Sequence, residues 1–329
     1  MKTLTTLLAG AAALGLTAGA HAQTAYMLGN NGTTLVAADP NGSNTDGATT
    51  TSITADGVAV ALTALTFRPQ TGQLYGYDAV SGTLYTVNPA TGEASVDFVF
   101  DTADAPRGDV QFDTNPNVDA FRFVGADGNN VVYFPDNSAT TANQGVVLTP
   151  TGNPDTISRI TYGAGYDAIT TAVGTPVLVA NGYTNQLDNA AALLENDGDP
   201  LLQYVLDATT DTIAILNNNA GTVDFEAFVQ DADGEAIDFD LTAAFDVFSD
   251  GSTDIGFALL TIDGEQTLFS VDLVSYVFTA LFTIDATFGA LTSLAVFDAD
   301  AGAVPIPAAG ALFAFGAAGL YGARRRKRA

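Results

Sequence analysis

The side chains that could carry chemistry in this chain are almost all carboxylates. All 37 Asp and Glu residues lie between positions 23 and 303, with only Arg68, Arg107, Arg122 and Arg159 as cations, so this stretch has a formal charge of −33. It contains no Cys or Lys, and the chain's single His is His21. Zinc and copper sites built from nitrogen and sulfur ligands, a Ser-His-Asp triad, a cysteine nucleophile and a lysine Schiff base are therefore excluded. Only Asp, Glu or Tyr could act as a general acid or base.

The acidic segments that bend at glycine are compatible with calcium, which binds oxygen ligands. None of them has the twelve-residue spacing of an EF-hand loop. Solvated charge on a turn is the alternative interpretation and the one we prefer. No other cofactor is indicated. The candidate calcium ligands are Asp231, Asp233, Asp250 and Asp254.

Two arginines lie next to turn-forming residues. Asn and Asp side chains bond the backbone of a turn, and Pro presets its dihedral angle, so we expect these residues to be structural. Each arginine could form a bidentate pair with a carboxylate, and Asp113 and Asp119 are the candidate partners of Arg122. Binding of a substrate anion or another ligand is the alternative. The residues concerned are Arg68, Pro69, Asp113, Asn115, Pro116, Asp119 and Arg122.

The segments that must position these residues are short runs rich in Val, Leu, Phe, Tyr and Thr. Four of them, at 61–67, 73–78, 83–88 and 95–100, are separated by turns rich in Gly, Pro and Asn. This pattern predicts one antiparallel meander. The only helix-like patch, 187–194, is too short to organise a domain. We therefore expect an all-β fold.

A repeated pattern indicates which all-β fold. An apolar strand that ends in Asn, Asp or Pro occurs five times, at intervals of about 46 to 72 residues, and a four-stranded propeller blade takes about 40 to 50. We predict a β-propeller of five four-stranded blades. The last strand, at 291–297, would complete the first blade and remove its exposed edge. A β-sandwich or a solenoid is the alternative. The copies begin at Leu35, Leu84, Val131, Gln203 and Leu268.

The first 22 residues are predicted to be a signal peptide. Lys2 precedes an apolar stretch at 4–16, and Ala20 and Ala22 have the small-x-small spacing of a cleavage site. The exported protein would then begin at Gln23. A core helix is the alternative.

The segment 304–329 is predicted to be a membrane anchor that follows a propeller at 23–303. Its apolar stretch, 304–323, is about the length of a membrane-spanning helix, and the basic cluster after it would stay on the cytoplasmic side. A helix packed on the domain is the alternative. The residues that stand out in this segment are Val304, Pro305, Ile306, Pro307, Arg324, Arg325, Arg326, Lys327 and Arg328.

Two resemblances to known families add to this interpretation. The tail resembles the PEP-CTERM class of bacterial sorting signals, in its V-P-L-P-A-A variant with Ile306 in place of Leu. That resemblance implies an exosortase-type processing enzyme as partner. The blocks at 66–75, 112–122 and 182–185 resemble the bacterial domain of unknown function family 4394, although Thr66, Thr114 and Ala120 depart from its pattern. This second resemblance implies no activity.

Three classes of function are compatible with these features. We prefer a non-catalytic binding or structural module at the cell surface, the outer membrane or in the extracellular matrix, held briefly at the inner membrane and in contact with polysaccharide or matrix. A carbohydrate-active hydrolase that uses Asp or Glu is the second class. A calcium-dependent adhesin is the third. The acidic surface repels nucleic acid, so no nucleic-acid partner is expected.

Overall fold

The computed structural model describes residues 23–45, 47–138, 143–150, 157–163, 165–166, 174–184, 201–249 and 253–298. The expected signal peptide at 1–22, the sorting segment at 304–329, the helix-like patch at 187–194 and Asp250 lie outside the described residues. Within the described part, no helix has both the length and the apolar character needed to cross a membrane.

One kind of turn recurs between strands and explains the repeats in the sequence. The side chain of Asp78 accepts hydrogen bonds from the backbone N–H groups of Val80 and Ser81, at 2.8 and 3.2 Å. The fifth residue, Gly82, has a φ of 73°, which costs glycine little, and its N–H donates to the Asp78 carbonyl at 2.8 Å. Equivalent turns begin at Asn88 and Asp272. Each of these turns reverses the chain after a short strand, which fixes the predicted meander.

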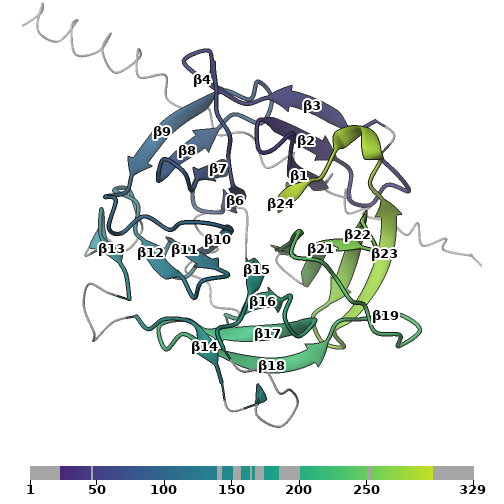
Figure 1. Cartoon of the computed structure of the whole chain (residues 1–329). Helices are drawn as coiled ribbons and strands as arrows, with labels where there is room; N and C mark the ends of the chain where they lie inside the picture. Colours follow the sequence, from purple (N-terminus) through teal and green to yellow (C-terminus); the bar gives the residue numbers. More distant parts are fainter. Residues whose placement is uncertain are drawn as a thin grey trace, which may run out of the picture.

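Five antiparallel sheets surround one axis (Figure 1). From the axis outward, blade 1 consists of β24 (Thr292–Asp298), β1 (Gln23–Gly29), β2 (Thr34–Ala38) and β3 (Thr49–Ser52). Blade 2 consists of β6 (Ala64–Arg68), β7 (Gln73–Asp78), β8 (Thr83–Val87) and β9 (Ala94–Val99). Blade 3 consists of β10 (Val110–Asn115), β11 (Ala120–Gly125), β12 (Asn130–Tyr133) and β13 (Val147–Leu148). A small hairpin, β4 (Thr54–Ala55) and β5 (Val58–Ala59), leads from blade 1 to blade 2.

The last two blades each carry a fifth strand. Blade 4 consists of β15 (Leu178–Tyr183), β16 (Gln203–Asp207), β17 (Thr212–Asn217), β18 (Thr222–Phe228) and the outer β14 (Thr161–Tyr162). Blade 5 consists of β20 (Ala243–Ser249), β21 (Asp254–Ile262), β22 (Glu265–Asp272), β23 (Val277–Thr283) and the outer β19 (Gln230–Asp231). One short 3-10 helix, η4 (Ala286–Phe288), lies between β23 and β24.

The prediction of five blades is confirmed, but that of four strands in every blade is wrong for blades 4 and 5. The additional strands β14 and β19 are parallel to the strands they join, β18 and β23. Both belong to connections that run along the outer strand of the next blade before they turn toward the axis. The connection after β3 begins the same way, with a parallel bridge from Thr54 to Glu93. These segments cover part of the outer edge of each sheet.

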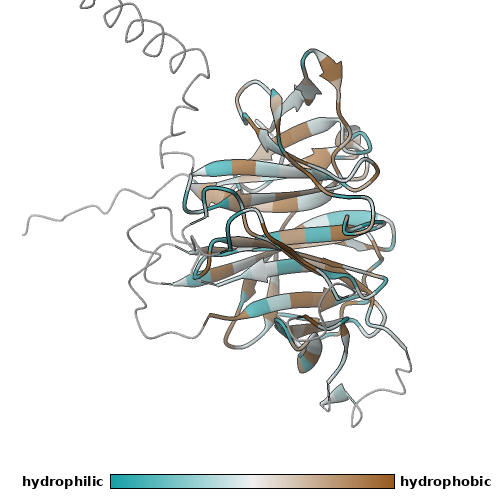
Figure 2. Cartoon of the chain, turned by 90° about the vertical axis from the view of Figure 1, so that its left-hand side faces the viewer, coloured by the Kyte–Doolittle hydropathy of each residue, from teal (hydrophilic) through white to brown (hydrophobic). Residues whose placement is uncertain are grey.

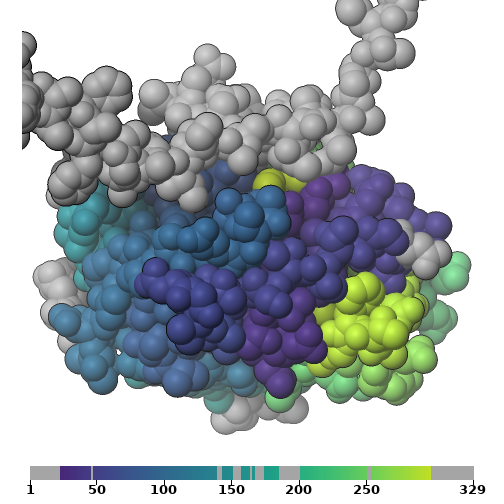
Figure 3. Space-filling view, turned by 90° about the horizontal axis from the view of Figure 1, so that it is seen from above, coloured from purple at the N-terminus to yellow at the C-terminus, as the bar shows by residue number. Residues whose placement is uncertain are grey.

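The predicted closure is confirmed. The last strand, β24, is the innermost strand of blade 1 and pairs antiparallel with β1, from Gln23 opposite Asp298 to Leu28 opposite Thr292. Figure 3 shows the yellow C-terminal end of the described chain packed against the purple N-terminal blade. The two ends of the propeller therefore share one sheet.

The core lies between the blades. Phe297 stacks on Tyr26 and on Phe67, with ring centroids 4.9 and 4.2 Å apart, and so joins blades 1 and 2. Tyr77 of blade 2 packs against Phe123 of blade 3 at 4.9 Å. Hydrophobic and hydrophilic residues alternate along the strands when the disc is seen from its side (Figure 2). The inner strands, such as β6, β11, β15 and β20, are buried along their whole length, so both faces of each sheet pack against the neighbouring blades near the axis.

Candidate functional site

Asp113 joins three blades at the centre of the ring. It lies on the innermost strand of blade 3, and its Oδ1 accepts a hydrogen bond from the Thr66 hydroxyl of blade 2 at 2.6 Å. Its Oδ2 accepts the backbone N–H of Tyr183 in blade 4, also at 2.6 Å. The carboxylate therefore ties blade 3 to both of its neighbours, which favours the structural interpretation of this residue.

A second central carboxylate, Asp246, lies on the innermost strand of blade 5. Its Oδ2 accepts the backbone N–H of Val296, in the closing strand of blade 1, at 2.6 Å. Burial raises the pKa of the Asp246 carboxyl well above its usual range, and the charge of Asp113 raises it further. Asp246 therefore binds a proton more readily in the folded protein than in the unfolded chain.

The other two junctions between innermost strands are closed differently. Ser293, at a bulge in β24 with a φ of 61°, accepts the Leu65 backbone N–H of blade 2 at 2.7 Å. Between blades 4 and 5, Gly182 packs on the ring of Phe245, where an added Cβ would lie only 2.9 Å from the ring. Together with the hydrogen bonds of Asp113 and Asp246, these contacts connect all five innermost strands.

A pair of buried acids, one with a raised pKa, is also the combination that a carboxylate-based hydrolase uses. Here Asp113 is only 2% exposed and Asp246 only 5%, and each accepts hydrogen bonds from neighbouring blades. The arrangement supports a role in holding the ring together more than a role in catalysis.

Arg68 and Asp119 form a buried bidentate ion pair between blades 2 and 3. The Arg68 Nε and Nη2 donate to the two Asp119 carboxylate oxygens at 2.7 and 2.6 Å, and both side chains are at most 1% exposed. Arg68 also donates to the Asn137 side chain at 2.8 Å. Its guanidinium carbon lies about 6 Å from the ring centroids of Tyr75 and Phe121. The expected structural pairing is present at Arg68.

Arg122 pairs with neither Asp113 nor Asp119, the two partners that the sequence suggested. Its Nε donates to the Tyr183 hydroxyl at 2.9 Å, and its Nη1 donates to the Asn130 side chain at 2.5 Å. Its Nη2 donates to the Asn219 side chain at 2.8 Å. Asp119 points from its turn toward the preceding blade and Arg122 toward the following one, which separates the two in space. Arg122 thus ties blade 3 to blade 4 through neutral oxygens.

The remaining predicted residues lie in turns. Asn115 accepts the backbone N–H of Asn117 at 3.1 Å, and Pro116 follows it in the turn between β10 and β11. Pro69 occupies the same place in the turn between β6 and β7. Asn115 thus bonds the backbone of its own turn, and the two prolines follow directly after innermost strands.

The candidate calcium ligands that the structure describes, Asp231, Asp233 and Asp254, form no cluster of metal ligands. Asp231 accepts the backbone N–H groups of Asp233 and Glu235, each at 2.9 Å, within its own turn. Asp254 accepts a short hydrogen bond from Ser249, in another part of the sheet. No group of three or more potential metal ligands occurs in the part of the chain that the structure describes.

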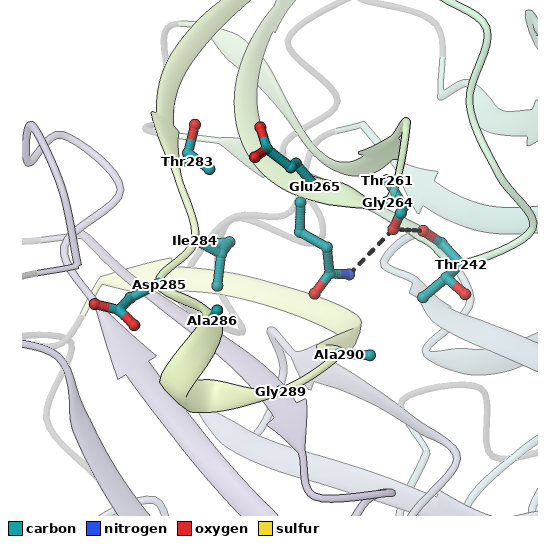
Figure 4. A pocket seen from close by; sticks show the side chains of 11 residues that line it. Thr242, Thr261, Gly264, Glu265, Thr283, Ile284, Asp285, Ala286, Gly289 and Ala290 are labelled. Atoms are coloured by element: carbon teal, nitrogen blue, oxygen red, sulfur yellow. Dashed lines mark hydrogen bonds between the residues drawn. The ribbon is translucent and has the colours of Figure 1, made fainter.

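A pocket of about 380 Å³ lies where the connection to the closing strand passes the turn between β21 and β22 (Figure 4). This volume is within the range of small-molecule sites. Gln266 lines it and is held by three hydrogen bonds: its Oε1 accepts the Leu291 N–H at 2.6 Å, while its Nε2 donates to the Leu291 carbonyl at 2.7 Å and to the Thr261 hydroxyl at 3.3 Å. Glu265, Ile284 and Asp285 also contribute to its lining.

The model of a family described as "Domain of unknown function (DUF4394)" matches residues 34–295. The chain belongs to the DUF4394 family. The match confirms the resemblance carried by the blocks at 66–75 and 112–122, and it includes the 182–185 element, of which the structure describes residues up to Thr184. No curated protein matches this DUF4394 chain.

Solved structures of low identity also resemble it. A protein of unknown function from Bacteroides caccae is 9% identical, with a TM-score of 0.44 over 84% of this chain and 98% of that one. An auxiliary nutrient binding protein from Bacteroides thetaiotaomicron is 13% identical, with a TM-score of 0.40 over 71% of this chain. The DUF4394 chain spans only 55% of the length of that protein. A nidogen/laminin complex is 12% identical, with a TM-score of 0.43 over 83% of this chain and 98% of that one.

Several residues of this DUF4394 propeller were not predicted as site residues. Asp246 and Ser293 lie in strands that resemble ordinary apolar strands, and only the ring places them beside other blades. Gln266 and Glu265 face a connection some 20 residues further along the chain. One feature of the sequence could have indicated this pocket. The predicted closure implied that the segment between β23 and β24 passes from blade 5 to blade 1.

Proposed function

We propose that this DUF4394 protein is an exported, non-catalytic propeller that serves as a binding or structural module at the cell surface or in the extracellular matrix. The observation that carries the proposal is the use of Asp113: both of its carboxylate oxygens accept hydrogen bonds from neighbouring blades. An acid engaged in this way holds the scaffold and is poorly placed to attack or protonate a substrate.

Export and sorting belong to the same proposal. Ala20 and Ala22 provide the cleavage spacing, and the motif at 304–307 with the basic cluster at 324–328 would be handled by an exosortase-type enzyme. The formal charge of −33 on residues 23–303 supports exposure to an aqueous, ion-rich surrounding, where salt screens the self-repulsion.

Cell fractionation tests the sorting. The full chain should accumulate at the surface or in the matrix, while a chain that ends at Ala303 should appear mainly in the medium. A full chain with Pro305→Ala and Pro307→Ala separates the motif from the apolar span and the basic cluster. Equal surface retention of the full and the shortened chain would disprove the sorting.

A carboxylate-based hydrolase is the second candidate, and the raised pKa of Asp246 beside Asp113 is the observation that favours it. The exported protein would be incubated with neutral and acidic polysaccharides, and reducing ends would be counted. We expect binding without new reducing ends. Release that disappears in Asp246→Asn, with folding intact, would replace our proposal by the hydrolase.

A further inference from the structure

The pocket beside Gln266 is lined by blade 5 and by the connection that follows this blade in the chain. Thr261 and Glu265 belong to blade 5, whereas Asp285 and Ala290 belong to the connection that leads into the closing strand β24. A molecule in this pocket would therefore contact both blade 5 and the segment that completes blade 1.

The floor of the pocket is held in place by hydrogen bonds within the protein. The Gln266 side-chain oxygen accepts the Leu291 N–H and its nitrogen donates to the Leu291 carbonyl, while the Thr261 hydroxyl donates to the Thr242 carbonyl at 2.7 Å. Gln266 is only 8% exposed. A site whose lining is already ordered loses little conformational freedom when a ligand binds.

The groups left at the rim are mainly hydrogen-bond acceptors. Glu265 is exposed, and Figure 4 shows its carboxylate at one edge of the pocket together with Thr283. The exposed Asp285 carboxylate accepts the Thr287 backbone N–H at 2.8 Å, and this bond lowers the pKa of Asp285, so it stays ionised. A ligand that fits must bring hydrogen-bond donors.

The rest of the lining favours an uncharged ligand with apolar C–H surface. Ile284, Ala286 and Ala290 form an apolar part of the wall. Two carboxylates at the rim repel anions, and no Lys or Arg lines the pocket to bind them. A sugar ring combines hydroxyl donors with C–H faces and carries no charge.

We propose that this pocket binds a neutral sugar residue of an extracellular polysaccharide, with Glu265 accepting hydrogen bonds from its hydroxyl groups. This inference deepens the proposed function and rests on it. It also gives binding a structural consequence, because the sugar would link blade 5 to the closing connection and so stabilise the closed ring.

The test uses the protein as released by its producing cells. Glucose, galactose, mannose and N-acetylglucosamine are titrated by calorimetry, with galacturonate and butylamine as charged probes, and melting temperature is followed in parallel. We expect millimolar binding of at least one neutral sugar, a rise in melting temperature with it, and no binding of galacturonate.

Three variants locate the site. Ala290→Phe should fill the pocket and abolish sugar binding. Glu265→Gln should weaken it about tenfold, through loss of a charge-assisted hydrogen bond. Glu235→Gln removes the same charge from a turn outside the pocket and should leave binding unchanged.

The outcomes separate this inference from the proposed function. If Ala290→Phe still binds the sugar, if butylamine binds more tightly than every neutral sugar, or if no neutral sugar binds, the pocket assignment is wrong. The parent protein and the variants are also mixed with polysaccharide and matrix isolated from the producing cells. Capture by Ala290→Phe as strong as by the parent overturns the pocket alone, whereas no capture by the parent overturns the binding function as well.

Discussion

Asp119 holds Arg68 through two parallel hydrogen bonds, of 2.7 and 2.6 Å, from a turn position where φ is 49°. At the corresponding position of the turn between β6 and β7 the residue is Gly72, with a φ of 64°. Asp119 therefore has a backbone conformation that is strained for a residue other than glycine. Its side chain compensates for this strain, because it neutralises a buried cation of the neighbouring blade.

Asp119→Asn should therefore destabilise the protein strongly. The change leaves the Arg68 charge buried without its counter-ion, which costs about 3 to 5 kcal/mol in the free energy of unfolding. Urea denaturation measures the loss. Asp56→Asn is the matched control, because Asp56 has a similar φ of 51° and is exposed. Similar stability of the two variants would contradict the importance of the pair.

The two central carboxylates should respond differently to amidation. Asp113→Asn places an NH₂ group against the Thr66 hydroxyl or the Tyr183 N–H, both of which donate to Asp113, and should cost about 1 to 3 kcal/mol. Asp246→Asn mimics the protonated form and should cost less than this. Denaturant titration at neutral pH gives both values, and an Asp246→Asn loss larger than that of Asp113→Asn would contradict the raised pKa of Asp246.

The raised pKa of Asp246 also predicts the sign of a pH effect. The folded protein holds this proton at pH values where an unfolded Asp has lost it, so its contribution to stability is complete below the ordinary Asp pKa and is lost as the pH rises through the raised pKa. The free energy of unfolding of the parent should therefore fall with pH relative to that of Asp246→Asn. Parallel curves for the two proteins would show that the pKa of Asp246 is not raised in the folded protein.

Gln266→Leu should weaken the ring at its closure. The change leaves the N–H and the C=O of Leu291 without their partner, and each buried unsatisfied group costs about 1 to 3 kcal/mol. Thermal unfolding measures the change. Gln111→Leu, at a half-buried position on β10, is the comparison and should shift the melting temperature less.

Calcium should leave the melting temperature unchanged at millimolar concentration. The Asp231 Oδ1 accepts two backbone N–H groups of its own turn, and no group of three or more potential metal ligands occurs among the described residues. A calcium-dependent rise that is absent in Asp231→Asn would instead support the calcium-dependent adhesin.

The closure and the number of blades could be predicted because they follow from local patterns. The strand at 291–297 had no partner nearby in the sequence, and the first blade had no innermost strand. The outer strands β14 and β19 could not be predicted, because each has two residues and forms only where a connection meets the next blade. Their parallel pairing depends on the assembled ring.

The candidate site was harder to predict from the sequence than the fold was. Arg122 lies three residues after Asp119, and this closeness suggested a pair, yet the turn directs the two side chains to opposite neighbours. The pocket at Gln266 depends on the path of the connection between β23 and β24, which has no characteristic residue pattern of its own.

The direction of the closing strand also determines on which side of the disc the chain leaves the propeller after β24. β24 starts at Thr292, beside the connection that lines the pocket, and ends at Asp298, opposite Gln23. Seven residues in extended form span roughly 20 Å. A tether attached beyond Asp298 would leave the disc on the side opposite the pocket. The pocket would then point away from the surface that holds the tether. Any pull on that tether would load the β1–β24 ladder in shear, so the strand pairing that closes the ring would bear the force.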